Sequence, residues 1–203
     1  MSRFSPYWLW VLLALPALGF TIQLTTSDDT RVVHQLLHPT GEFSARFMII
    51  AMLASPLALL LRGWRGPQWL KKNRRYFGVA AFGYAALHTL LYLIDEGTAG
   101  RVIADLPNLY IWTGWVAFLI FIPLAVTSMD YFVRRMGSFW KTLQRTTYAA
   151  AALTLIHWAA LHDWGGLGPA LVHFGPLVFL EIYRLWYWYL RPRRITADQE
   201  IEI

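Results

Sequence analysis

The stretch from Tyr76 to Ile94, YFGVAAFGYAALHTLLYLI, contains no Asp, Glu, Lys or Arg, and its one ionisable side chain apart from the tyrosines is His88. A helix needs about 20 mostly apolar residues, each rising ~1.5 Å, to cross the ~30 Å hydrocarbon core of a bilayer. The stretch is therefore predicted to cross a membrane as a single α-helix.

Five further stretches of the chain have the same character. The six predicted spans are residues 7–24, 43–61, 76–94, 109–133, 147–162 and 168–190. Hydrophobic residues make up 57% of the 203 positions and charged residues 15%, against about 25% charged in a soluble domain. These values exclude a soluble globular enzyme. The predicted fold is all-α, a polytopic six-transmembrane-helix bundle that forms one domain over residues 1–203.

The charges in the connections predict the orientation of the bundle. The connection between spans two and three carries six cations and no anion: Arg62, Arg65, Lys71, Lys72, Arg74 and Arg75. The connection between spans four and five carries Arg134, Arg135, Lys141 and Arg145 beside Asp130, and span six is followed by Arg191, Arg193 and Arg194. The alternate connections carry mainly acids. By the positive-inside rule, both termini and the two basic loops are expected in the cytoplasm, with the chain multi-pass in a bacterial inner membrane.

The first span has an alternative interpretation as a secretory signal peptide. Arg3 precedes the apolar run, and Ala17-Leu18-Gly19 resembles a cleavage site. The apolar run is long for a signal peptide, so the span is retained in the prediction. The hydrophilic segments are short and offer no room for a nucleotide-binding domain, and the chain shows no internal repeat. If the protein moves electrons, it is expected to take them from a separate donor.

The absence of cysteine excludes several metal centres. No disulfide, thiolate zinc site, cysteine-ligated iron–sulfur cluster or covalently attached haem is possible. A metal centre would have to use histidine, carboxylate, methionine or a bound cofactor.

Two histidines are predicted to lie at the same depth of the membrane. His88 follows Arg75 by 13 residues, and His157 follows Arg145 by 12 residues. At ~1.5 Å per residue they lie ~20 Å and ~18 Å from the cytoplasmic ends of two helices that run in the same direction. Two neutral imidazoles at one level can supply both axial ligands of a haem iron, which here would be a non-covalent b-type haem. A structural or proton-relay role for the two histidines remains the alternative.

Neighbouring residues bear on this interpretation. Ala81 and Ala85 share the face of His88, and Ala150 and Ala160 share that of His157, so a macrocycle would have room beside each ring. Small residues are also the ordinary means of close helix packing in membranes. His173, which enters span six from the outside, is a possible substitute ligand. His162 at the outer rim is expected to be solvated or bound to a haem propionate. Glu181 and Arg184 are predicted to pair.

Four stretches of the sequence resemble the MsrQ (also called YedZ) family of the ferric-reductase-like transmembrane group. They are HPTGEFSARFMIIAMLASPLA (38–58), RRYFGVAAFGYAALH (74–88), LAVTSMDYFVRRMGSFWKTLQRTTY (124–148) and IHW (156–158). The resemblance implies a haem-binding membrane subunit of the periplasmic methionine-sulfoxide reductase system, and it puts the family's haem-ligand histidines on His88 and His157. His38 also matches a family histidine.

The resemblance further implies a path for electrons. A cytoplasmic flavin reductase or quinol would donate them, and a periplasmic molybdopterin enzyme would use them to reduce oxidised methionine. The chain would then be an electron-transfer subunit of an oxidoreductase rather than a complete enzyme. FMN is associated with the family, but no residue of this sequence can be assigned to it. Membrane lipid is an expected partner, and nucleic acid is not.

The sequence departs from the family pattern at one position. The family commonly has a histidine in the segment before span five, where this chain reads Leu143-Gln144-Arg145. Since glutamine is a poor haem ligand, one haem per chain is predicted. The alternatives are a divergent ferric-reductase-like cytochrome b with another acceptor, a non-haem transporter-like bundle, and a purely structural membrane anchor.

Overall fold

The computed structural model describes residues 7–191, and every regular element within that range is a helix. In chain order the α-helices are α1 (Tyr7–Thr26), α2 (Val32–Leu60), α3 (Arg65–Glu96), α4 (Ala99–Asp105), α5 (Leu109–Val126), α6 (Asp130–Met136), α7 (Ser138–Arg145), α8 (Thr147–Ala159), α9 (Leu161–Trp164) and α10 (Leu167–Leu185). A π-helical turn, Trp186–Leu190, follows α10. The chain ends, including Arg3, Arg193 and Arg194, lie outside the described residues.

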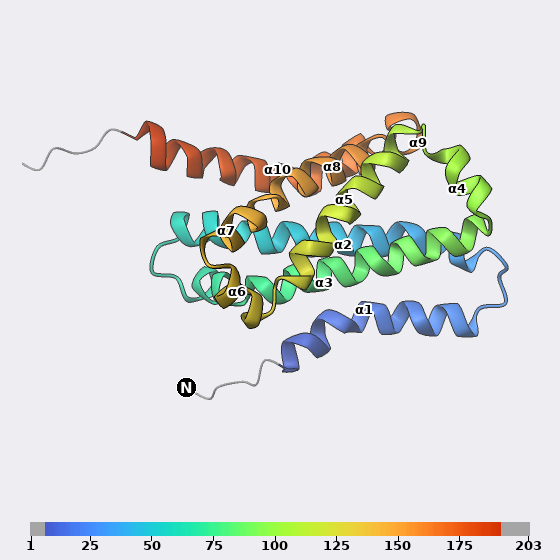
Figure 1. Cartoon of the computed structure of the whole chain (residues 1–203), viewed down its shortest axis with the longest axis horizontal. Coiled ribbons are helices and arrows are strands. Elements are labelled where there is room, and N and C mark those ends of the chain that lie inside the picture. Colours follow the sequence, from blue (N-terminus) through green and yellow to red (C-terminus); the bar gives the residue numbers. More distant parts are fainter. Residues whose placement is uncertain (1–6, 192–203) are drawn as a thin grey trace, which may run out of the picture.

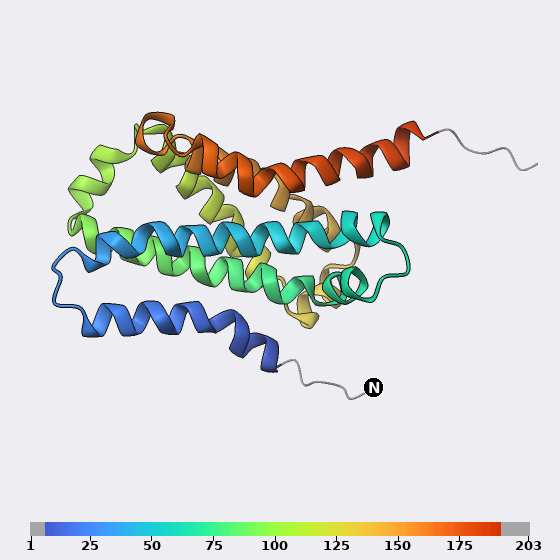
Figure 2. The same ribbon diagram turned by 180° about the vertical axis from the view of Figure 1, so that it is seen from behind.

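Four of these helices are long and apolar enough to cross a membrane: α1, α2, α3 and α5. The helices α8 and α10 run along the same long axis of the bundle (Figures 1 and 2), but α8 has only 13 residues and α10 carries the ion pair of Glu181 with Arg184, at 2.8 Å. That ion pair confirms the pairing predicted for these two residues. The all-α prediction holds throughout the described range.

Two antiparallel helix pairs form the centre of the bundle. The first is α2 with α3, the second is α5 with α8, and α10 packs against both α2 and α8. Small side chains allow the close approach: Ala45, Ala81, Ala150, Ala159 and Ala170 are each at most 3% exposed. Within a membrane the hydrophobic effect does not drive helices together, because lipid tails are as apolar as the side chains. Close packing of small residues is therefore a main source of the attraction between helices.

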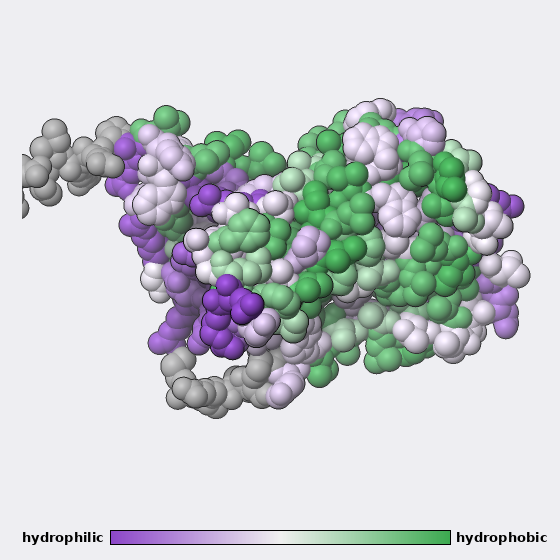
Figure 3. All heavy atoms as spheres, viewed as in Figure 1, coloured by the Kyte–Doolittle hydropathy of each residue, from purple (hydrophilic) through white to green (hydrophobic). Residues whose placement is uncertain are grey.

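The surface of the bundle has the distribution expected for contact with lipid. Apolar side chains cover its flank, while hydrophilic residues gather toward its ends, most densely near α6 and α7 (Figure 3). On α10, Val172 and Phe179 are 73% and 71% exposed. Arg75 of α3 forms an ion pair with Asp130, the first residue of α6. The hydrogen bond from this guanidinium holds the pKa of Asp130 below its ordinary value of 3.8.

The helix bounds differ most from the predicted spans at the end of α5 and at the starts of α2 and α3, where α3 begins at Arg65 instead of the predicted Tyr76. The span predicted over 109–133 is wrong at its end, because α5 stops at Val126. Pro123 lies in its last turn, and the hydroxyls of Thr127 and Ser128 donate to the carbonyls of Pro123 and Leu124, both at 2.7 Å. The Ser128 hydroxyl thus replaces a backbone donor at the Leu124 carbonyl, while the Thr127 hydroxyl adds to the backbone bond that Thr127 already makes with Pro123. The span predicted over 43–61 begins 11 residues earlier in the structure, at Val32, because the helix continues through polar residues.

One tyrosine of the bundle makes hydrogen bonds to the backbone of the first helix. Tyr84 of α3 is 5% exposed, and its hydroxyl lies inside the hydrogen-bond ladder of α1. It donates to the carbonyl of Leu13 and accepts from the N–H of Ala17, both at 2.9 Å. Pro16 interrupts the ladder here. A side chain inserted into a helix ladder is one of the recognised causes of a bend.

Candidate functional site

The structure brings His88 of α3 and His157 of α8 together in the middle of the two helix pairs. Their ring centroids lie 6.1 Å apart, and the ring planes are inclined by 83°. Both rings are half-buried. The equal depth expected from the sequence is thus accompanied by direct ring-to-ring proximity, which the sequence alone could not establish.

A backbone carbonyl orients each of these rings. The Nδ1 atom of His88 lies 2.9 Å from the carbonyl oxygen of Leu37, and that of His157 is hydrogen-bonded to the carbonyl oxygen of Tyr110. Because a carbonyl oxygen only accepts, each Nδ1 carries the proton and each Nε2 keeps a free lone pair. Histidines that bind metal commonly donate their other ring N–H to such a partner, which selects the tautomer and the ring orientation.

The separation of the rings matches what one metal atom between them requires. With metal–nitrogen bonds of about 2 Å and ring centroids about 1.1 Å behind the nitrogens, two imidazoles on opposite sides of one iron have centroids roughly 6 Å apart. The observed distance is 6.1 Å. The residues present therefore fit a bis-histidine haem iron.

A large cavity adjoins the pair. Its volume is about 740 Å³, and both histidines line it, within the ~300–1,000 Å³ range of cofactor and ligand sites. Its walls are mainly apolar, with Ala85, Ala117, Phe118 and Phe121 among them. Ala85 and Ala160, two of the four alanines singled out in the sequence, line this cavity, whereas Ala81 and Ala150 pack in the core.

Polar groups form the rim of the cavity. Carboxylates and histidines from α2, α3, α4 and α9 line it: His34, Asp95, Glu96, Asp105, His162 and Asp163. The Nδ1 atom of His34 is hydrogen-bonded to the Oδ2 atom of Asp95 at 2.8 Å. His38 also lines the cavity, and its ring centroid lies 6.3 Å from that of Trp158. His38 and His162 are thus in a position to meet an anionic group of a bound cofactor.

The structure does not bring His173 to the histidine pair. Its Nε2 atom accepts a hydrogen bond from Nε of Arg46 at 3.2 Å and lies 3.5 Å from the carboxylate of Glu42. Arg46 and Glu42 are themselves paired at 2.5 Å. His173 does not line the cavity. The sequence analysis missed Glu42 and Arg46, although two opposite charges spaced i,i+4 at the start of an apolar run are a recognisable signal.

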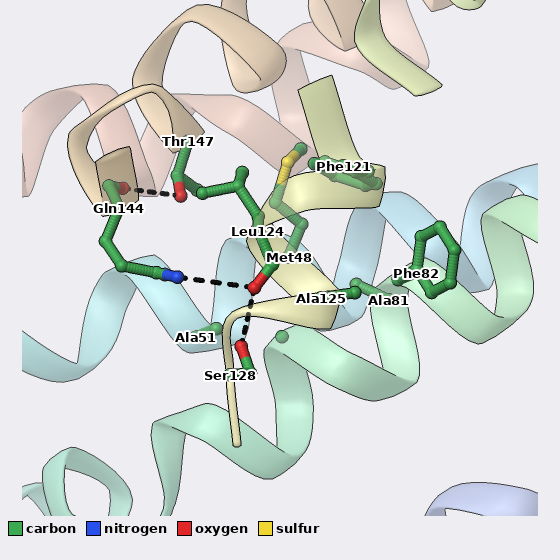
Figure 4. A pocket seen from close by; sticks show the side chains of 11 residues that line it. Met48, Ala51, Ala81, Phe82, Phe121, Leu124, Ala125, Ser128, Gln144 and Thr147 are labelled. Atoms are coloured by element: carbon green, nitrogen blue, oxygen red, sulfur yellow. Dashed lines mark hydrogen bonds between the residues drawn. The ribbon is translucent and has the colours of Figure 1, made fainter. Parts of the chain in front are cut away.

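A second, much smaller cavity lies beside Gln144 (Figure 4). Its volume is about 60 Å³, and Met48, Phe121, Ser128 and Thr147 are among the residues that line it. The amide Nε2 of Gln144 donates to the carbonyl of Leu124 at 3.3 Å. Since cofactor sites have volumes of about 300–1,000 Å³, this space is too small for a macrocycle.

Comparison with known proteins agrees with this architecture. Residues 40–155 match the family model described as a ferric reductase like transmembrane component. The fold and the match together define a membrane protein of the ferric-reductase-like class. No solved structure is significantly similar to the chain.

Individual relatives narrow the class further. The chain is 34% identical over 155 residues to the protein-methionine-sulfoxide reductase heme-binding subunit MsrQ of Rhizobium meliloti, covering 74% of this chain and 69% of the relative. It is 31% identical over 205 residues to MsrQ of Agrobacterium fabrum, covering 98% and 91%. The magnetosome protein MamZ of Magnetospirillum gryphiswaldense is 34% identical over 154 residues, which cover 73% of this chain and 23% of that protein. The chain belongs to the MsrQ family, as the resemblance of the four sequence stretches predicted.

Proposed function

We propose that the protein is a haem b membrane electron-transfer subunit in which His88 and His157 would hold the haem iron. The observation that carries the proposal is the geometry of the pair, with ring centroids 6.1 Å apart and each Nδ1 bonded to a carbonyl. Bound there, a haem supplies one-electron transfer at an iron. The chain's residues orient the two Nε2 atoms and surround the site with apolar side chains.

The proposed topology has six spans with both ends in the cytoplasm of a bacterial inner membrane. The direction of α8 and α10 along the bundle supports it (Figure 1), as do the basic residues Arg134 and Arg135 of α6 and Arg145 of α7. The cavity then opens toward the periplasm, since the rim residues from α4 and α9 lie at the opposite end of the bundle from α6 and α7. The short α8 would cross the membrane while packed against its neighbours α5 and α10.

The proposed electron path runs from a cytoplasmic flavin reductase or quinol to a periplasmic molybdopterin methionine-sulfoxide reductase. The relatives named as subunits of a protein-methionine-sulfoxide reductase support this partner. FMN remains a proposed second cofactor without assigned residues. The small cavity beside Gln144 supports one haem per chain.

The test is an absorption spectrum of the purified protein in detergent, oxidised and then reduced with dithionite. We expect the bands of a low-spin b-type haem in the wild type, and their loss in His88→Ala and in His157→Ala. His173→Ala is the matched control, since its ring contacts Arg46 and Glu42 instead. A wild-type protein that stays colourless after reconstitution with haem would refute the proposal and favour a transporter-like bundle or a structural anchor.

A second candidate is a divergent cytochrome b with another acceptor. Gln144, at a position where the family commonly has histidine, favours it. The two candidates are separated by adding a purified periplasmic methionine-sulfoxide reductase to the reduced protein. Reoxidation that depends on sulfoxide supports the first candidate, and its absence supports the second.

A further inference from the structure

The two histidines lie in matching surroundings. Thr40-Gly41 of α2 stands opposite His88, and Thr113-Gly114 of α5 stands opposite His157. The chain contains two Thr-Gly dipeptides, and both are used here. Each helix pair of the bundle, α2 with α3 and α5 with α8, thus supplies one Thr-Gly and one histidine.

The hydrogen bonds of the two threonines follow one pattern. Thr40, which is 0% exposed, donates to the carbonyl of Leu36 at 2.7 Å and lies 3.0 Å from that of Leu37. The second half has the same arrangement. Thr113, also 0% exposed, donates to the carbonyl of Leu109 at 2.6 Å and lies 3.2 Å from that of Tyr110.

These bonds converge on the carbonyls that orient the histidines. The carbonyl three residues before each threonine, in Leu37 or Tyr110, also accepts from Nδ1 of the opposing histidine. The threonine hydroxyl therefore helps to hold the acceptor, and the acceptor holds the ring. In the sequence, the only sign of these two matching arrangements is the repeated Thr-Gly dipeptide.

The glycine of each dipeptide leaves room for the ring. A Cβ atom on Gly114 would lie 2.7 Å from Nδ1 of His157, and one on Gly41 would lie 3.1 Å from Nδ1 of His88. Both distances are shorter than ordinary van der Waals contact, so either ring would have to move. By contrast, a Cβ on Gly83 of α3 would meet nothing within 4 Å.

We propose that Gly41 and Gly114 are positioning residues that set the rotation and distance of the two imidazoles from opposite sides of one site. The Thr-Gly dipeptide and the histidine form a half-site, and the bundle contains the half-site twice. This inference rests on the haem proposal for what the Nε2 atoms bind. The placement of the rings by the glycines does not depend on it.

The first experiment compares Gly114→Ala and Gly41→Ala with the control Gly83→Ala. Alanine favours a helix more than glycine does, so helix propensity alone would stabilise all three variants. We expect Gly114→Ala to bind haem with about tenfold lower affinity, the lower end of the usual cost of disturbing a group that orients a metal ligand. Gly41→Ala, with the longer contact, should keep its haem but show shifted electron paramagnetic resonance g-values and a shifted midpoint potential. Gly83→Ala should match the wild type.

The second experiment does not require haem. With ¹⁵N-labelled histidine in the haem-depleted protein, the wild type should show the Nδ1–H tautomer for both rings. Gly114→Ala should change the signal of His157, and Gly41→Ala that of His88. If the wild type binds no haem, the proposed function fails, and these spectra alone decide the present inference.

The inference is overturned if both alanine variants keep wild-type haem content, potential and histidine spectra, or if Gly83→Ala changes them equally. Should Gly114→Ala fail to fold, Gly41→Ala and Thr113→Val carry the test. The valine variant keeps the shape of threonine and removes only the hydroxyl, with its bond to the Leu109 carbonyl and its longer contact with the Tyr110 carbonyl. It should shift the midpoint potential while leaving the haem bound, and an unchanged potential in both remaining variants would refute the role.

Discussion

Replacing Tyr84 by phenylalanine should weaken the attachment of α1 to the bundle. The phenolic oxygen takes part in two hydrogen bonds, with Leu13 and Ala17, each 2.9 Å long. Helix α1 also meets the bundle through the buried Leu9 and Leu13 and through aromatic contacts such as Phe20 with Phe43, and these contacts remain in the variant. The substitution removes one oxygen atom and leaves the ring in place.

The expected magnitude follows from the number of bonds. Side-chain hydrogen bonds between membrane helices contribute about 0.6 kcal/mol each on average, so two bonds amount to about 1.2 kcal/mol. Since 1.4 kcal/mol corresponds to a factor of ten, local opening of α1 should become roughly eightfold more frequent. The effect should be confined to the segment around Ala17.

Hydrogen–deuterium exchange in detergent measures this opening, because local unfolding exposes backbone amides. Peptides containing residues 13–17 should exchange roughly eightfold faster in Tyr84→Phe, while peptides from α5 and α8 should not change. Tyr131→Phe is the control, because Tyr131 is 58% exposed. Unchanged exchange around Ala17, or the same acceleration in the control, would refute the bridging role.

Three further outcomes are expected. Gln144→His should still give one haem per chain by pyridine haemochrome assay, because the adjoining cavity holds only about 60 Å³; two haems would contradict this. Arg46→Met should destabilise the protein by about 1 kcal/mol in thermal unfolding, because the Glu42 carboxylate loses its arginine partner in a partly exposed ion pair, and the added change Glu42→Gln should restore most of that loss. A double variant no more stable than Arg46→Met would count against the pairing. Asp130→Asn should lower stability at neutral pH; since the pKa of Asp130 is depressed in the folded protein by Arg75, its contribution is present above the ordinary value of 3.8 and is lost as the pH falls through the folded pKa. A difference between variant and wild type that persists at lower pH would exclude this cause.

The helical membrane class was predictable because it depends on composition and run length, which are local properties. The end of α5 was not. Apolar residues recur in Met129 and at positions 131–133, but Thr127, Ser128 and Asp130 stand among them, and the hydroxyls of Thr127 and Ser128 bind the carbonyls of Pro123 and Leu124 where α5 ends. The early start of α2 was missed for the opposite reason, since a helix continues through polar residues once it leaves the predicted hydrocarbon region.

The position of the two histidines along their helices was predictable, but the identity of their neighbours was not. The rise per residue places His88 and His157 at one level, whichever neighbours they have. His173 also lies within a predicted span and was a possible substitute ligand, yet in the structure it contacts Arg46 and Glu42. Which histidines meet is a matter of helix rotation and packing, and both arise from contacts between distant parts of the chain.

The sequence by itself determined that this chain is a helical membrane protein of the MsrQ family with two histidines at matching depth, because hydrophobic run length and helical rise act locally. Only the tertiary structure decided that those rings lie next to each other, that the carbonyls of Leu37 and Tyr110 orient them, and that Gly41 and Gly114 make room for them. The residues in each of these contacts are more than 40 positions apart, as with His88 and Leu37, separated by 51. No local pattern specifies such a partner, and the packing of complete helices selects it.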